Sequence, residues 1–101
     1  MMDFFKDVAN DIKRDYGERS ITSMCFFGLA EEAGEVLGIA KRRKRMRGLG
    51  DLDRSTHDCL VSELGDVLWY IAAIAHDQGI SFDEIWEENR RKINGRYGKQ
   101  A

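Results

Sequence analysis

Apolar residues recur at the spacing of helix faces along most of the chain, and they predict four helices and no strand. The helices are expected at about residues 3–16, from the Ser20–Ser23 region to residue 47, at 56–79 and at 81–94. The sequence contains no proline, which suits long uninterrupted helices. We therefore expect an all-α fold, a four-helix bundle formed by a single domain over residues 1–101.

Signals at the helix ends agree with this division. Gly17 stands where a left-handed cap would end the first helix. The segment from Gly48 to Ser55, with two glycines and two aspartates, is the clearest loop. Ser81 and Glu84 have the spacing of a capping box, which predicts the start of the fourth helix.

Each of the first three helices carries an apolar stripe that is expected to face the core. The expected core residues are Phe5, Val8, Ile12 and Tyr16, then Phe26, Leu29, Ala33, Val36 (or Leu37) and Ala40, then Leu60, Leu64, Val67, Ile71 and Ile74. The second and third helices are apolar around more than one face, which is more than a lone chain of this length covers. We therefore expect a homo-oligomer with a helical interface, a dimer rather than a tetramer.

Composition narrows the class of protein. Hydrophobic residues make up 43% of the 101 residues and charged residues 34%, so we expect neither a disordered chain nor a membrane protein. The first seven residues contain two aspartates where a signal peptide needs a basic region followed by an apolar one. Cys25 and Cys59 lie in apolar helical contexts without metal-ligand spacing, and we expect both to be reduced core residues. These features predict a cytoplasmic protein.

Two acidic pairs are the main candidate chemistry. Glu32 and Glu35 are three residues apart on the second helix, and Glu63 and Asp66 are three apart on the third, so each pair shares a face. Both pairs border an apolar stripe, which directs them toward the bundle. Two unit charges about 4 Å apart repel by roughly 4 kcal/mol at an effective dielectric near 20. The carboxyls must take up protons or share a cation, and oxygen ligands select hard ions such as Mg²⁺, with Mn²⁺ as a substitute.

The alternative is that these acids are solvated side chains paired with nearby lysines and arginines. One such pair alone is usually of that kind. Two pairs favour the metal site, because glycine lies beside both: Gly28, Gly34 and Gly38 on the second helix and Gly65 on the third. Glycine in a helix costs roughly 1 kcal/mol relative to alanine, and here it leaves room for a ligand or a close helix.

The two acidic motifs resemble those of a known family. Glu-Glu-x-x-Glu from residue 31 and Glu-Leu-Gly-Asp-Val-Leu from residue 63 resemble the MazG-like, all-α nucleoside triphosphate (NTP) pyrophosphatase superfamily. Residues 89–97 are similar to the closing Asn-x-x-Lys-Leu-x-x-Arg-Tyr pattern of that family, so the resemblance covers about residues 26–97. It implies that Glu32, Glu35, Glu63 and Asp66 bind Mg²⁺. It also implies that the enzyme cleaves a ribo- or deoxyribonucleoside triphosphate, a (d)NTP, to the monophosphate and pyrophosphate.

Several further residues are candidates for substrate binding. Asn89, Lys92 and Arg96 share one face of the fourth helix, where cations suit a triphosphate. Tyr70 lies one turn beyond Asp66 and is placed to stack on a base, although a core tyrosine is equally consistent. Arg42 is the member of the basic run 41–47 best placed for substrate phosphates. The run as a whole lacks interleaved aromatic residues and a nucleic-acid-binding motif, so we do not expect a nucleic acid partner.

The resulting hypothesis is metal-assisted hydrolysis of a phosphoanhydride bond, as part of nucleotide-pool house-cleaning. A metal lowers the pKa of a bound water, and either Glu35 or Glu63 accepts the proton of that water. One alternative is a phosphoribosyl-ATP pyrophosphohydrolase of histidine biosynthesis, which shares the carboxylate cage. The other is a regulatory bundle that binds the nucleotide without hydrolysing it.

Overall fold

A computed structural model of the chain describes residues 2–17, 21–45 and 54–96, which form four helices. They are α1 (Met2–Tyr16), α2 (Thr22–Arg45), α3 (Arg54–Gln78) and α4 (Phe82–Arg96). Their number and order match the prediction from the sequence, and their ends differ from it by at most two residues wherever both ends are described. Most of the predicted loop at residues 48–55 lies outside the described residues.

The predicted helix ends are formed by local backbone and side-chain hydrogen bonds. Gly17 adopts a left-handed φ of 64°, and its N–H donates to the carbonyl of Lys13 at 3.1 Å. At the end of α3, Gly79 has a φ of 69°, and the N–H of Ile80 donates to the carbonyl of Ala75 at 2.8 Å. The capping box at the start of α4 is present, since Ser81 N–H donates to Glu84 Oε1 at 2.9 Å and Glu84 N–H to Ser81 Oγ at 3.1 Å.

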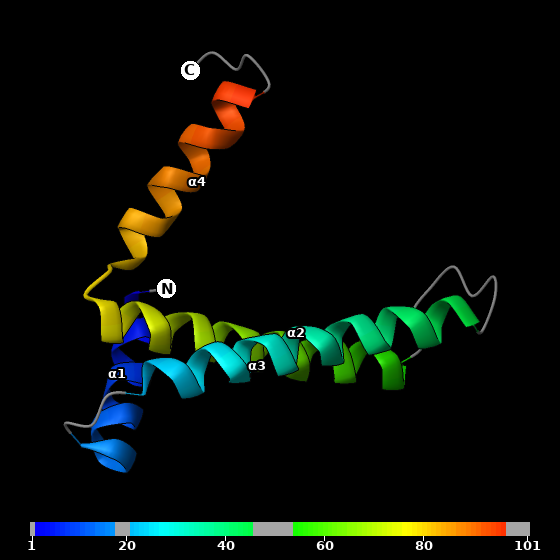
Figure 1. Cartoon of the computed structure of the whole chain (residues 1–101). Helices are drawn as coiled ribbons and strands as arrows, with labels where there is room; N and C mark the ends of the chain where they lie inside the picture. Colours follow the sequence, from blue (N-terminus) through cyan, green and yellow to red (C-terminus); the bar gives the residue numbers. More distant parts are fainter. Residues whose placement is uncertain (1, 18–20, 46–53, 97–101) are drawn as a thin grey trace.

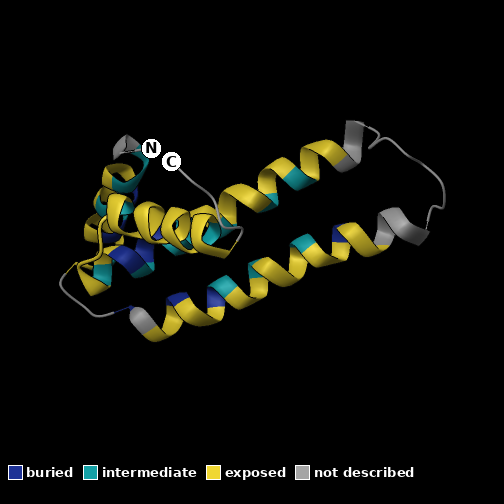
Figure 2. Cartoon of the chain, turned by 90° about the horizontal axis from the view of Figure 1, so that it is seen from above, coloured by how far each residue is buried: buried dark blue, intermediate teal, exposed yellow. Residues whose placement is uncertain are grey.

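The helices α2 and α3 form an antiparallel hairpin, and α1 crosses α3 near its C-terminal end (Figure 1). The core lies at this crossing, and most of the rest of α2 and α3 is exposed (Figure 2). Phe4, Phe5, Tyr16, Trp69, Tyr70 and Ile74 are half-buried and surround that core. The fully buried residues of the cluster are Val8, Ile12, Ile21, Cys25, Ala72 and Ala73.

The predicted core stripe of α2 was wrong in part. Phe26, Ala33 and Ala40 are exposed, whereas Leu29 and Val36 are half-buried. The buried residues of α2 are instead Cys25, Gly28 and Ile39, on the row that also carries Glu32. Apolar spacing alone does not choose between two apolar faces of a helix, and here the face with the acids is the one that meets α3.

Two residues of α3 were also expected in the core and are exposed. Leu64 is 46% exposed, and the thiol of Cys59 is exposed as well. With Val61 and Leu68, Leu64 forms an exposed apolar stripe at spacings of three and four residues, called here the α3 stripe. The segment 57–78 of α3 is long and apolar enough to cross a membrane, a property that core helices of soluble proteins share. In this chain, however, only 17% of the most apolar window of the segment is buried. Much of the apolar surface of α3 is therefore left uncovered within one chain.

The helix α4 leads away from the other three (Figure 1) and has no buried residue. At the start of α4, Phe82 meets Phe5 of α1 edge-on, with 5.6 Å between the ring centroids, and it stacks on Trp86 of its own helix at 6.4 Å. The radius of gyration is 16.6 Å, whereas a compact chain of this length has about 13 Å. Within one chain, the packed body is thus made by α1, α2 and α3.

Candidate active site

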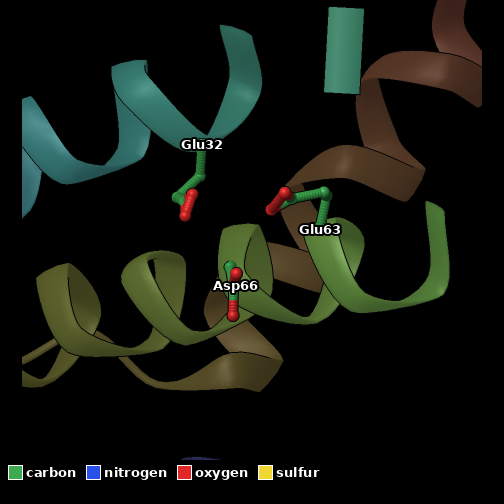
Figure 3. Close-up of side chains that lie close together, drawn as sticks. All are labelled: Glu32, Glu63 and Asp66. Atoms are coloured by element: carbon green, nitrogen blue, oxygen red, sulfur yellow. The ribbon is translucent and has the colours of Figure 1, made fainter. Parts of the chain in front are cut away.

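Three of the four predicted metal ligands meet between α2 and α3. Glu32 extends from α2 toward Glu63 and Asp66 of α3 (Figure 3), and one carboxylate oxygen from each lies within 4.8 Å of the others. The three-residue spacing of Glu63 and Asp66 places both on the face of α3 that meets α2. Glu32 and Glu63 are half-buried, and Asp66 is exposed.

Glu35 lies outside this group of three and is exposed. It is nevertheless close enough to act on the group electrostatically, because its charge contributes to raising the pKa of both Glu32 and Glu63. For Glu32 and Glu63, the main cause of the raised pKa is the partial loss of solvent, followed by repulsion from the neighbouring carboxylates. The cluster thus disfavours its own negative charge.

The residues present fit a hard divalent cation. All three side chains offer carboxylate oxygens, the ligands that Mg²⁺ and Mn²⁺ prefer. Opposite ligands of Mg²⁺ are about 4.2 Å apart, close to the spread of the three oxygens in this cluster. A cation would also remove the repulsion that raises the two pKa values.

Two of the three carboxylates, those of Glu32 and Asp66, line a pocket of about 360 Å³ whose other walls are mainly aromatic. Its lining residues are Tyr16, Met24, Glu32, Asp66, Trp69 and Tyr70, which come from α1, α2 and α3. One space therefore combines a carboxylate end, where a cation would fit, with flat aromatic surfaces, the two features that suit a nucleoside triphosphate.

Tyr70, predicted either to stack on a base or to fill the core, is half-buried and does line this pocket. Its ring lies against the backbone of Gly28, where a Cβ atom would overlap the ring. Trp69 meets Tyr70 edge-on, with 5.3 Å between the ring centroids. Loss of solvent raises the pKa of the Tyr70 hydroxyl, with a smaller contribution from the charge of Glu32. Among the glycines beside the acids, Gly28 thus permits a close approach, whereas Gly34, Gly38 and Gly65 face open space.

Two pocket residues and one supporting residue were missed from the sequence. Trp69 was not among the candidate residues, although it lies three residues beyond Asp66 and thus on the same face of α3. Met24 lies two turns before Glu32 on the same row of α2. Asp11 of α1 accepts a hydrogen bond from Trp69 Nε1 at 3.0 Å, a contact between residues 58 positions apart that no local pattern indicates.

The predicted phosphate-binding residues of α4 do not join the site within one chain. Asn89, Lys92 and Arg96 are exposed, and none of them lines the pocket that contains Glu32 and Asp66. The side-chain oxygen of Asn89 accepts hydrogen bonds from Arg90 instead. Arg42 lies in α2, but its side chain is outside the described residues.

Comparison with known proteins identifies the family of the chain. The sequence model of the MazG nucleotide pyrophosphohydrolase domain matches residues 22–100, which include all four acids. A relative in Mycobacterium phage L5, named "Gene 37 protein", is 33% identical over 69 residues, which cover 68% of this chain and 60% of that protein. No solved structure matches the chain. By its fold and site, the chain is an all-α protein with a carboxylate cluster beside an aromatic pocket. By its sequence, the chain belongs to the MazG nucleotide pyrophosphohydrolase family.

Proposed function

We propose that the protein hydrolyses (d)NTPs to the monophosphate and pyrophosphate in a Mg²⁺-dependent reaction that removes unwanted nucleotides from the pool. The observation that carries this proposal is that Glu32 and Asp66 line the same pocket as Tyr16, Trp69 and Tyr70. A base against the aromatic walls leaves its phosphates at the carboxylates. Bare phosphates would be repelled there, so a cation must lie between the two sets of charges.

The four acids divide into two roles in this proposal. Glu32, Glu63 and Asp66 hold Mg²⁺, which polarises the phosphates and lowers the pKa of a bound water when it is present. Glu35 is exposed beside the cluster and outside the group of three, which leaves it available to accept the proton of the attacking water. Glu63 is the alternative base, in which case it would accept the proton of the water and would not be a ligand of the cation.

Product analysis tests the reaction. The protein is incubated with Mg²⁺ and each canonical dNTP and NTP, and monophosphate and pyrophosphate are measured. Asp66→Asn is expected to lose both Mg²⁺ binding and activity. Glu35→Gln is expected to keep Mg²⁺ binding and lose at least about a hundredfold in kcat, the usual effect of removing a general base. The matched control is Glu87→Gln, which removes one exposed carboxylate from α4 and should change neither.

The same assay separates the alternatives. Turnover of phosphoribosyl-ATP together with no turnover of any dNTP or NTP would assign the protein to histidine biosynthesis. Tight Mg²⁺-dependent nucleotide binding without monophosphate would make it a regulatory bundle. Full activity of both Asp66→Asn and Glu35→Gln would exclude the carboxylate mechanism.

The active form proposed is a homodimer in which a second copy covers the apolar surface left exposed. The chain exposes 7715 Å², whereas a compact chain of its mass exposes about 5,800 Å². This excess of roughly 1,900 Å² per chain is larger than the roughly 800 Å² that each partner buries in a standard interface, and it falls in the range of about 1,000–2,500 Å² per partner of obligate dimers. The α3 stripe and Trp86 of α4 are apolar surface that a second copy would cover.

Charge complementarity suggests how two copies are arranged. The second half of α4 carries Arg90, Arg91, Lys92 and Arg96, and the face of the hairpin carries the acidic cluster. In the proposed dimer, α4 of each copy packs against the hairpin of the other, so that Lys92 and Arg96 reach phosphates held at the other chain's carboxylates.

Mixing two impaired variants tests this arrangement. Lys92→Ala and Glu32→Gln should each be nearly inactive alone. If the cations act on the second copy, each mixed dimer contains one intact site, and random mixing should restore about a quarter of the wild-type activity. If Lys92 acts within its own chain, mixing restores none, and the arrangement is wrong.

A further inference from the structure

The pocket receives part of its wall from a helix outside the matched family domain. The family match begins at residue 22, whereas Tyr16 of α1 lines the pocket together with Trp69 and Tyr70. Asp11, also on α1, is hydrogen-bonded to Trp69. Residues preceding the matched domain thus touch the space where the base of a nucleotide would lie.

The hydrogen bond between Asp11 and Trp69 links α1 to that wall. Asp11 Oδ2 accepts from Trp69 Nε1 at 3.0 Å, and both side chains are half-buried. A tryptophan whose N–H has a partner has one preferred ring orientation in its site. Since Trp69 also meets Tyr70 edge-on at 82°, the orientation of one ring constrains the other.

From these contacts we propose that α1 is the specificity element of the nucleotide pocket, with Asp11 as a positioning residue that acts through Trp69 and Tyr16 as a direct contact to the base. The proposal rests on the proposed function, since it takes the ligand to be a nucleoside triphosphate. Glu32 and Asp66 occupy the charged part of the pocket, so the planar base belongs with the aromatic residues. Aromatic side chains stack on any base, and selectivity then comes from the shape of the slot they form.

Variants of Asp11 separate its hydrogen bond from its charge. Asp11→Leu removes the acceptor at similar volume, whereas Asp11→Asn keeps an acceptor oxygen for the indole and loses the ion pair with Arg14, whose Nη1 lies 3.5 Å from Oδ1. Asp7→Leu is the matched control, because it removes the same charge from an exposed position one turn earlier on α1. All variants are made in the full chain carrying Trp86→Phe, so that Trp69 is the sole tryptophan.

The probes are the α,β-methylene analogues of the four canonical dNTPs, which resist cleavage between the α- and β-phosphates, with Mg²⁺ present. Binding is followed by quenching of Trp69 fluorescence, and KM and kcat are measured with the natural dNTPs. Asp11→Leu should weaken analogue binding and raise KM about five- to tenfold with kcat nearly unchanged. Asp11→Asn and Asp7→Leu should stay within about twofold of the parent. Tyr16→Ala should change the order of preference among the four bases.

A double-mutant cycle excludes a merely structural effect. In a Trp69→Phe background, which lacks the indole donor, Asp11→Leu should cause no further change in KM. Mn²⁺ binding to the carboxylates, measured by electron paramagnetic resonance without nucleotide, should be the same in every Asp11 variant. An equal loss of kcat and Mn²⁺ affinity in Asp11→Leu, or an unchanged analogue affinity in both Asp11→Leu and Tyr16→Ala, would overturn the proposal.

These outcomes are distinguishable from failure of the proposed function. If neither the wild-type protein nor the Trp86→Phe parent hydrolyses a dNTP or binds an analogue, the proposed function is wrong, and so is the role of α1. If the parent hydrolyses dNTPs and the α1 variants behave like it, only the role of α1 is wrong.

Discussion

At the scale of single residues, the carboxyls of Glu32 and Glu63 ionise less readily than exposed glutamates do. Partial loss of solvent and the charges around them raise both pKa values on folding. The folded chain therefore binds more protons than the unfolded chain. The two carboxyls therefore stabilise the folded chain most at a pH below the usual pKa of glutamate. This contribution is lost as the pH rises through their raised pKa values in the folded chain. In the proposed metal site, Mg²⁺ would replace these protons at higher pH.

This competition predicts a pH-dependent response to Mg²⁺. The rise in thermal midpoint on adding Mg²⁺ should be larger at a mildly alkaline pH than at an acidic pH closer to the raised pKa values of Glu32 and Glu63, because protons there compete with the metal for these carboxyls. Without Mg²⁺, protonation of Glu32 and Glu63 should contribute a rise in the thermal midpoint as the pH is lowered from alkaline to acidic. Scanning calorimetry with and without Mg²⁺ measures both. An equal Mg²⁺ response at the two pH values would contradict the assignment of the cluster as the metal site.

Neutralising one member of the cluster should separate stability from metal binding. Glu63→Gln removes one of the repelling charges, so the metal-free protein should melt at a higher temperature at neutral pH. The same change should weaken Mg²⁺ binding at least about tenfold, because a ligand is lost. Calorimetric titration and thermal melts provide the two readouts, with Glu87→Gln as the control that moves neither. A metal-free protein that melts lower after the substitution would argue against the repulsion.

Gly28 offers a steric test of the pocket. Gly28→Ala places a Cβ into the Tyr70 ring, so the ring must move and KM should rise about tenfold. Gly38→Ala is the matched control on the same helix, where nothing lies within 4 Å of the new methyl group. It should stabilise α2 by up to about 1 kcal/mol and leave KM unchanged. Similar KM values for the two variants would mean that Tyr70 is not part of the binding surface.

At the scale of elements, α4 depends on its caps more than the other helices do, because none of its residues is buried in the chain. Ser81→Ala removes the oxygen that accepts from the Glu84 amide and should cost about 1 kcal/mol of helix stability. Hydrogen exchange of the amides in the first turn of α4 should accelerate accordingly, while α2 and α3 keep their protection. Glu87→Ala, one turn beyond the cap, should leave that exchange unchanged. Equal exchange in the Ser81 variant would mean that other contacts hold the start of α4.

The elements also show which part of the site follows from sequence. The acid spacing on α2 and α3 dictates that each pair shares a face, and the hairpin joins the two faces. Spacing did not reveal that Glu35 stays outside the group, because its position depends on how α2 is rotated toward α3. For the same reason, the predicted core stripe with Phe26 and Ala33 was wrong: the rotation of α2 buries Cys25 and Gly28 instead.

At the scale of the whole molecule, the exposed α3 stripe predicts association. The wild-type protein should sediment at a multiple of its 11.6 kDa chain mass. Val61→Glu places a charge on the stripe and should shift the protein toward the mass of one chain, with loss of activity. Ser62→Glu adds the same charge at the neighbouring exposed position outside the stripe and should leave the sedimentation unchanged. A wild-type protein that sediments as a single chain would exclude the dimer.

The sequence by itself determined the four helices, their caps and the pairing of the acids, because each depends on residues within a few positions of one another. The sequence also identified the family, because the acidic motifs of the family each lie within a single helix. Only the tertiary structure decided that Glu32, Glu63 and Asp66 meet and that Trp69 and Tyr16 enclose the space beside them. Only the tertiary structure showed that α4 does not pack along α1, α2 and α3 within one chain. These features depend on how the helices are rotated and crossed, and residues within a few positions of one another do not fix those angles.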